Sequence, residues 1–198
     1  MARPVAKDHD AKRLAILKTA ARVCAEEGVA RASMSVIARA CGISKATIYH
    51  YYDSKEALLF DILDSYLAAL RDRLCAVDAP LAPAPEQLHR ITREALLAYE
   101  GMDHEHKIQT EVMALLSPPQ QEVLRGYQRD MVARMGAILA ALAPDTLRND
   151  PAKLREATMS VFGMLNWFYM WNRSAGRRER ERYAAQVARM TIGGVEAL

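Results

Sequence analysis

The chain has 198 residues, of which 51% are hydrophobic and 7% aromatic, and it carries a formal net charge of +3 at pH 7. That length suits one large or two small domains with a sizeable core. The longest run without a charged residue, 157–172, is 16 residues with several polar side chains, whereas a membrane span needs about 20 apolar residues, so composition argues against a membrane protein. No N-terminal segment has the pattern of a secretory signal, and we expect a cytoplasmic protein.

The positive charge is concentrated at the N-terminal end of the chain. Residues 1–52 hold nine Lys or Arg against four Asp or Glu, a balance of +5, which leaves −2 for the rest. Residues 1–9 show no periodicity and are expected to form either a disordered terminus or an arm that reaches into a minor groove. Apolar residues at helical spacing then predict a first helix over 10–27, which ends at Gly28.

The stretch 33–55, SMSVIARACGISKATIYHYYDSK, has the pattern of two short helices around a tight turn. Ser33 can cap the first helix and Ser44 the second, because each hydroxyl can accept a bond from a free backbone N–H. Gly42 falls where the first helix must stop, and a residue without Cβ adopts a positive φ there at little cost. This is the pattern of a helix-turn-helix, whose second helix enters the major groove of DNA.

The second helix of this pair carries side chains that suit DNA. Ile48 and Tyr52 are four residues apart and can hold the helix against its domain. Lysine and tyrosine can contact phosphates, Thr47 can contact a base edge or a thymine methyl group, and the small Ala46 permits close approach to the groove. The side chains left outside are Lys45, Ala46, Thr47, Tyr49, His50 and Tyr51.

From residue 14 to residue 59 the chain resembles the N-terminal domain of the TetR family of bacterial transcriptional repressors. The family pattern I-A-x-x-x-G-x-S-x-x-T-x-Y, followed by S-K-E-x-L, is matched by Ile37, Ala38, Gly42, Ser44, Thr47, Tyr49, Ser54, Lys55, Glu56 and Leu58. The resemblance implies DNA contacts from Ser33, Ser35, Ser44, Lys45, Ala46, Thr47, Tyr49, His50, Tyr51 and Lys55. Many members have Phe where this chain has Tyr52, whose hydroxyl needs a partner or water.

Beyond the motif, the pattern is helical to the end of the chain. Ser54 is expected to cap a long helix to about residue 76, and the Pro-rich segment 78–85 marks the passage to a second domain. Further helices are predicted over 86–102, 106–116, 119–142, 151–173 and 179–195. The expected fold is all-α, with a helix-turn-helix DNA-binding domain, a connecting helix, and a larger ligand-binding and dimerisation domain over residues 1–54, 55–77 and 78–198.

The last two helices are predicted to form a homodimer. The segment VFGMLNWFYMW is apolar nearly all round, as expected of a helix covered by its own domain and by a partner, although an internal core helix is the alternative. In the TetR family the last two helices of each protomer form a four-helix bundle across a two-fold axis, and this layout is similar. Such a dimer would read a palindrome with two recognition helices about 34 Å apart.

Regulators of this type need a second site, at which a small molecule favours one of two states. The segment GMLNWFYMWNR resembles the equivalent helix of family members that respond to acyl-CoA thioesters, and Arg173, Arg177 and Arg178 could meet CoA phosphates or form a basic solvated loop. An unrelated apolar or aromatic inducer is the alternative ligand. Candidate lining residues, each with ordinary packing or solvation as its alternative, are Tyr99, Met102, Met113, Leu116, Met135, Asn166, Trp167, Met170 and Arg173.

Other chemistry is not indicated. Residues 103–106 lack the spacing of a helical metal site and are expected to form a polar loop between helices. Cys24, Cys41 and Cys75 lie in apolar helical patterns and are expected to be buried free thiols. No glycine-rich phosphate loop, nucleophile elbow or paired catalytic motif is present, so we expect neither an enzyme nor a cofactor.

The sequence therefore predicts a homodimeric repressor, released from a palindromic DNA operator by a small-molecule inducer that is apolar or an acyl-CoA. One alternative is a multidrug or aromatic-compound sensor of the same type. An alternative of another class is a helical small-molecule-binding or interaction protein without specific DNA binding.

Overall fold

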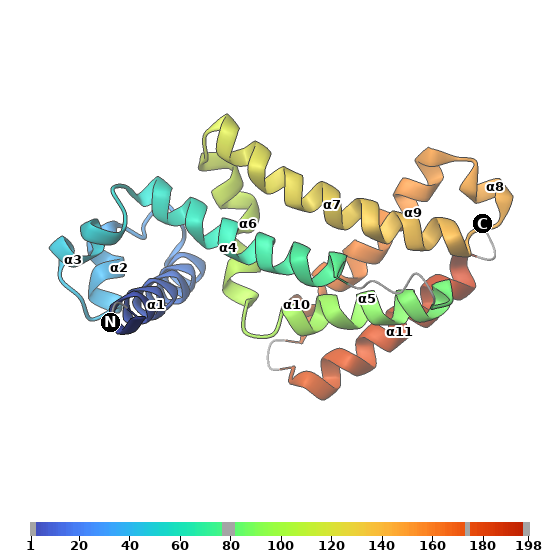
Figure 1. Ribbon diagram of the computed structural model, residues 1–198, viewed down its shortest axis with the longest axis horizontal. Coiled ribbons are helices and arrows are strands. Elements are labelled where there is room, and N and C mark those ends of the chain that lie inside the picture. Colours follow the sequence, from blue (N-terminus) through green and yellow to red (C-terminus); the bar gives the residue numbers. More distant parts are fainter. Residues whose placement is uncertain (1–2, 77–81, 173–174, 196–198) are drawn as a thin grey trace. The chain divides into compact units, whose positions relative to one another are not determined.

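The computed structural model of the chain describes residues 3–76, 82–172 and 175–195. Within those ranges all regular secondary structure is helical, which confirms the expected all-α fold (Figure 1). The described helices are α1 Arg3–Glu27, α2 Met34–Ala40, α3 Lys45–Tyr51, α4 Lys55–Cys75, α5 Ala84–Ala98, α6 Asp103–Leu115, α7 Pro118–Leu142, α8 Asp145–Arg148, α9 Pro151–Asn166, α10 Phe168–Trp171 and α11 Arg177–Val195.

The chain packs as two compact units. The first consists of Met1–Leu67 and Gly101–Leu124, and the second of Ala68–Glu100 and Arg125–Leu198. Helix α6 thus packs with the N-terminal helices, although it lies far from them in the sequence. The domain boundaries predicted at residues 54 and 77 divide the chain in sequence order, and they stay a prediction. Among the described residues, no helix combines the length and the apolar content that a membrane span requires.

In the first unit, α1 is the central support. Its apolar positions Ile16, Leu17, Ala20 and Cys24 recur at helical spacing and are buried, and the helix contacts both α2 and α6. The predicted helix start at residue 10 is wrong, because α1 begins at Arg3 and the expected arm is helical from that residue on. Pro4 does not oppose this, since a proline in the first turn removes an N–H that has no helical partner anyway.

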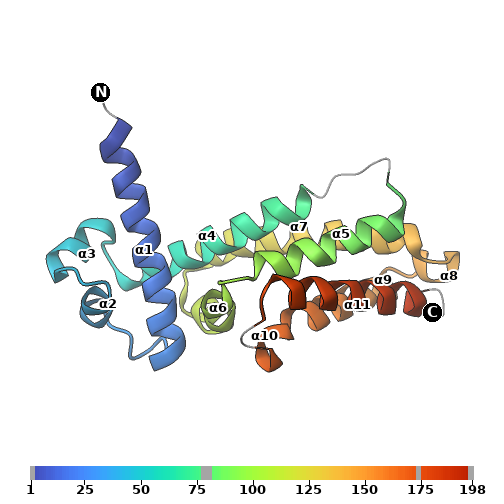
Figure 2. The ribbon, with the colours of Figure 1, turned by 90° about the horizontal axis from the view of Figure 1, so that it is seen from below.

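In the second unit, α5 and α11 run side by side, as Figures 1 and 2 both show. The buried stripe of α5 includes Leu88, Ile91 and Ala95, and it faces the buried positions of α11. The Thr92 hydroxyl donates to the Leu88 carbonyl oxygen at 2.9 Å, so this buried polar group is satisfied within its own helix.

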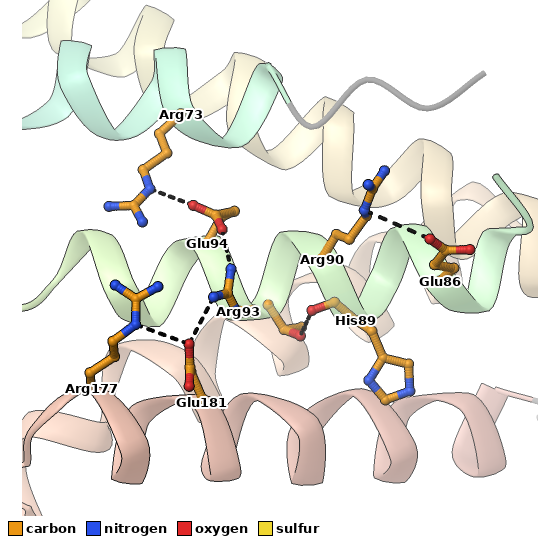
Figure 3. A network of polar contacts seen from close by, with 9 residues as sticks. Arg73, Glu86, His89, Arg90, Arg93, Glu94, Arg177 and Glu181 are labelled. Carbon is orange, nitrogen blue, oxygen red and sulfur yellow. Dashed lines mark hydrogen bonds and ion pairs between the residues drawn. The ribbon is translucent and has the colours of Figure 1, made fainter. Parts of the chain in front are cut away.

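Ion pairs at the edge of this contact connect three helices (Figure 3). Arg73 of α4 donates from Nε to Glu94 Oε2 at 2.6 Å, and Arg93 of α5 donates from Nη2 to Glu181 Oε1 of α11 at 2.8 Å. Arg177 donates to the same Glu181 oxygen at 3.2 Å. These side chains are partly exposed, so the pairs contribute orientation more than stability.

Several of the predicted helices differ from those of the structure. The acidic-histidine segment 103–106 was expected to be a loop, but it is the first turn of α6, where Asp103 and Glu105 suit the positive end of the helix dipole. The predicted helix over 151–173 is wrong beyond Asn166, since α9 ends there and the short α10 follows. The short helix α8 was not predicted.

Candidate nucleic-acid interface

Helices α2 and α3 form a tight helix-turn-helix, built as their local sequence predicts. The Ser33 hydroxyl accepts a bond from the Val36 backbone N–H at 3.3 Å, and the Ser44 hydroxyl accepts one from the Thr47 N–H at 2.9 Å. Gly42, between the helices, has a φ of 67°, in the left-handed region that favours glycine. Two caps and one glycine thus define where α2 stops and α3 starts.

Helix α3 is held by one fully buried side chain and exposes most of the others. Ile48 is 0% exposed, and it is the only buried residue within α3. The Lys45 ammonium lies 5.9 Å from the centroid of the Tyr49 ring, and Tyr49 is 43% exposed. The exposed residues of α3 are Lys45, Ala46, Thr47, Tyr49 and His50, all of them predicted to contact DNA.

The Thr47 hydroxyl already has a local partner. It lies 2.8 Å from the Ser44 hydroxyl oxygen, while the Ser44 oxygen also accepts the Thr47 N–H. The Thr47 methyl group and the remaining lone pairs of its hydroxyl oxygen are what this residue can offer to a base. Ser33 and Ser35 are exposed at the start of α2, where a phosphate oxygen could approach the free N–H groups of the helix.

Tyr51 is half-buried under two histidines. The His9 ring of α1 stacks on the Tyr51 ring with centroids 4.8 Å apart, and the His50 ring meets it edge-on at 5.9 Å. The stack joins the first helix to the last turn of α3. The sequence did not predict this contact, because His9 lay in a segment expected to have no regular structure.

Lys55, a predicted phosphate contact, is engaged within the protein. Its ammonium donates to the Val29 carbonyl oxygen and lies 3.4 Å from the Ala30 carbonyl oxygen. An ammonium group has three donors, so one remains for a phosphate. The Ser54 hydroxyl caps α4 by accepting the Ala57 N–H at 3.0 Å, which confirms the predicted start of that helix.

Tyr52 ends α3 and finds a partner that sequence reasoning missed. Its hydroxyl donates to Asp61 Oδ2 of α4 at 2.6 Å, and Arg13 Nε of α1 donates to the same oxygen at 2.9 Å. Burial first, and then the bond to Asp61, raise the pKa of Tyr52 above its usual value, so the hydroxyl keeps its proton and donates it. The sequence indicated only that the hydroxyl of Tyr52 needs a hydrogen-bond partner, and it did not indicate that Asp61 and Arg13 would form this network.

The predicted ligand-binding residues divide between the two units. In the second unit, the buried Tyr99 donates from its hydroxyl to Asn166 Oδ1 at 2.7 Å, so the amide that stood out in an apolar run has a partner in its own domain. Met135 is fully buried, whereas Trp167 and Met170 are 62% and 43% exposed. Met102, Met113 and Leu116 belong to the first unit, with Leu116 buried and the two methionines half-buried, and Arg173 lies outside the described residues.

Two cavities of the described chain have other linings. A cavity of about 340 Å³ in the first unit is bounded by residues of α4 and α6, among them Lys55, Leu59 and Leu115. One of about 330 Å³ in the second unit is bounded by α10 and α11, among them Trp171 and Tyr183. Neither is lined by a predicted ligand-binding residue, so those assignments stay predictions.

The cysteines differ in their burial. Cys24 is 1% exposed, as predicted, and burial raises the pKa of its thiol to about 11. Cys41 and Cys75 are only half-buried, although burial raises the pKa of both. Thiols with raised pKa values hold their protons and react slowly. Within the described ranges, no three His, Cys, Asp or Glu side chains are grouped so that they could hold a metal ion.

A capped helix-turn-helix, supported by a long first helix and followed by a second helical unit, defines the class of helix-turn-helix regulators. Comparison with known families agrees with this class and narrows it. The model of bacterial regulatory proteins of the tetR family matches residues 16–62, and the model of the tetracyclin repressor-like C-terminal domain matches residues 81–195. The chain belongs to the TetR family, whose members are transcriptional regulators rather than enzymes.

Solved structures and a curated relative are similar to this chain. A TetR-family transcriptional regulator from Bordetella parapertussis 12822 is 30% identical, with a TM-score of 0.83 over 90% of this chain and 93% of that one. AibR, solved in complex with isovaleryl coenzyme A and operator DNA, is 28% identical, with a TM-score of 0.74 over 90% and 97% of the two chains. The regulator BetI of Rhizobium meliloti (strain 1021) is 36% identical over 87 residues, which span 44% of this chain and 43% of BetI.

Proposed function

We propose that the protein is a transcriptional repressor, which binds a DNA operator through α3 and is released from it by a small molecule. The observation that carries this proposal is the exposed face of α3. One buried side chain, Ile48, anchors the helix, and five of its seven residues are exposed. They are one cation, two small side chains and two aromatic rings: Lys45, Ala46, Thr47, Tyr49 and His50. Phosphate contacts from lysine and tyrosine would position the helix, and Thr47 would read a base.

The DNA-binding form is proposed to be a homodimer through α9 and α11. Large apolar side chains are exposed on α9, at the residues between α9 and α11, and on α11, with Met159, Trp167, Trp171 and Met190 between 46% and 62% exposed. Exposed apolar side chains of this size on neighbouring helices are typical of a surface that a partner covers. A two-fold dimer would present two copies of α3 to a palindrome.

The dimer surface can be tested without DNA. Met190→Glu places a charge in the proposed interface and should convert the dimer to a monomer in sedimentation, whereas Met34→Leu, a conservative change in α2, should not. A wild-type protein that sediments as a monomer at micromolar concentration would contradict the dimer.

The inducer is proposed to be an apolar molecule or an acyl-CoA thioester, acting in the second unit. The support is the similarity to AibR, which was solved with isovaleryl coenzyme A and operator DNA, and the polar pair formed by the buried Tyr99 and the half-buried Asn166. A sensor of aromatic compounds or of several drugs is the second candidate, favoured by the adaptable methionines of the second unit, among them Met135 and Met170.

The ligand class can be tested by titration of a labelled operator complex. Short-chain and long-chain acyl-CoAs, the corresponding free acids, CoA alone and free aromatic acids would each be added at fixed salt, and fluorescence anisotropy would follow release of the DNA. Release by one acyl-CoA, but not by its free acid or by CoA, would support the thioester. Release by aromatic acids alone would support the second candidate, and tight ligand binding with no effect on DNA would contradict the repressor.

A further inference from the structure

Tyr52 stands at the point where the proposed reading helix joins the rest of the first unit. Its backbone N–H donates to the Ile48 carbonyl oxygen at 3.0 Å, and its φ of −141° and ψ of 118° take the chain out of the helix. Its side chain turns inward and is 7% exposed. The residue thus ends α3 and at the same time reaches into the supporting helices.

The partner of Tyr52 is a carboxylate that three segments share. Asp61 of α4 accepts the Tyr52 hydroxyl at 2.6 Å, and Arg13 of α1 engages both carboxylate oxygens, with Nε at 2.9 Å from Oδ2 and Nη2 paired with Oδ1. The Ser65 hydroxyl donates to Oδ1 at 3.3 Å. A two-pronged guanidinium contact fixes the plane of the carboxylate, and that plane fixes where the tyrosine hydroxyl must lie.

Besides the His9–Tyr51 stack and the packing of α2 against it, α3 is oriented by few other contacts. The helix has seven residues and a single buried side chain, and a helix of this length has little stability of its own. Ile48 can act as a pivot, because apolar packing carries no directional preference. The hydroxyl of Tyr52, one helical turn further on, supplies the directional bond that stops rotation about that pivot.

We propose that Tyr52 is a positioning residue for DNA reading, whose hydroxyl, held by the Asp61–Arg13 pair, sets the angle at which α3 is presented. Any displacement of Asp61 along α4 would then be passed to α3 through one short hydrogen bond. A phenylalanine at this position would pack in the same space but would leave that angle to packing alone. This inference rests on the proposed role of α3 as the reading helix.

The first test compares Tyr52→Phe with wild type on an operator and on a set of its single-base variants. We expect operator affinity to fall about tenfold, since a hydrogen bond to a charged group is lost. We also expect the affinity for the single-base variants to fall less than the affinity for the operator itself, so that the protein discriminates less between sequences. A structural role alone would lower the thermal midpoint without narrowing the discrimination between DNA sequences.

Tyr66→Phe is a matched control. The Tyr66 hydroxyl lies 2.9 Å from His106 Nδ1 of α6, and the side chain is 6% exposed. This change also removes the hydroxyl of a buried tyrosine in the first unit, but the bond to His106 leads to α6 and not to α3. Operator discrimination in Tyr66→Phe should match wild type. Equal discrimination in the two variants would overturn the inference.

A double-mutant cycle tests whether the effect runs through the shared carboxylate. If Tyr52 acts through Asp61, the loss of affinity in Tyr52→Phe combined with Asp61→Asn should be smaller than the two single losses together. Additive losses would contradict this route. Should Tyr52→Phe fail to fold, Arg13→Lys keeps the charge but not the two-pronged contact, and it should narrow discrimination in the same way.

Lys45→Ala separates failure of this inference from failure of the proposed function. If Lys45→Ala leaves operator affinity unchanged, α3 is not the reading helix, and both proposals fall. If Lys45→Ala weakens binding while Tyr52→Phe discriminates between sequences as wild type does, only the positioning role is overturned.

Discussion

Ser44 connects the fold of the reading helix to its proposed contact with DNA, and the two roles can be separated by mutation. Its hydroxyl oxygen accepts the Thr47 N–H at 2.9 Å and lies 2.8 Å from the Thr47 hydroxyl oxygen. The first turn of α3 has no acidic residue that could stabilise the helix start in its place. Ser44→Ala should therefore remove the whole benefit of the cap.

The expected magnitude follows from the cap. Loss of an N-terminal serine cap costs about 1 kcal/mol, which for a chain of this length corresponds to a thermal midpoint lower by about 2–4 °C. If binding to DNA has to supply this free energy in order to form α3, operator affinity should fall about fivefold, since about 1.4 kcal/mol corresponds to a tenfold change in affinity. Calorimetry and fluorescence anisotropy at two salt concentrations would measure these effects.

Ser44→Asp isolates the second role, because aspartate caps a helix as well as serine does. Stability should stay close to wild type, while the added carboxylate should repel phosphates and weaken operator binding more than Ser44→Ala does. Ser54→Ala, which removes the cap of α4 outside the predicted DNA contacts, is the control for a general loss of stability. Wild-type operator affinity in Ser44→Asp would refute the placement of Ser44 against DNA. An unchanged thermal midpoint in Ser44→Ala would show that the Ser44 hydroxyl does not stabilise the start of α3.

Three further predictions concern the same unit. Gly42→Ala should lower the free energy of unfolding by about 1 kcal/mol in chemical denaturation, because alanine is strained at the positive φ of this position. An added Cβ would have nothing within 4 Å of it, so no clash adds to that cost. A loss above about 4 kcal/mol would contradict this explanation. Glu105 is 6% exposed, its Oε2 has no hydrogen-bond partner among the described residues, and burial raises its pKa. The protonated form is favoured in the folded protein and is lost as the pH rises through the raised pKa. Glu105→Gln should therefore have a higher thermal midpoint than wild type at about pH 8 and a similar one at about pH 4. A lower midpoint of Glu105→Gln at about pH 8 would contradict this prediction. Thr47→Ala should change preference at particular bases in a binding-site selection, and equal losses on every operator variant would exclude a base contact.

The parts of the fold that the sequence predicted correctly depend on neighbouring residues. Ser33, Gly42, Ser44 and Ser54 act within three or four positions of their own backbone, and the structure confirms each of them as a cap or a turn. The all-helical class and the transcription-regulator family were likewise readable from local pattern. Such features do not require knowledge of which distant segments meet.

The parts that could not be predicted depend on distant partners. Arg13 and Asp61 are 48 positions apart, and nothing in either neighbourhood indicates the other. The apolar run around Trp167 predicted a continuous helix, yet α9 ends at Asn166, and Trp167 is 62% exposed in the described chain. An apolar run alone does not say which of its faces is covered by the same chain.

The central claim is that α3 reads a specific operator, and selection of bound DNA from a random duplex pool at stated salt tests it most directly. We expect a palindrome with half-sites about one helical turn apart, and the same selection with Thr47→Ala should change the recovered bases. Recovery of no preferred sequence by the wild-type protein would contradict the claim, and would direct attention to the second unit as the functional part of the chain.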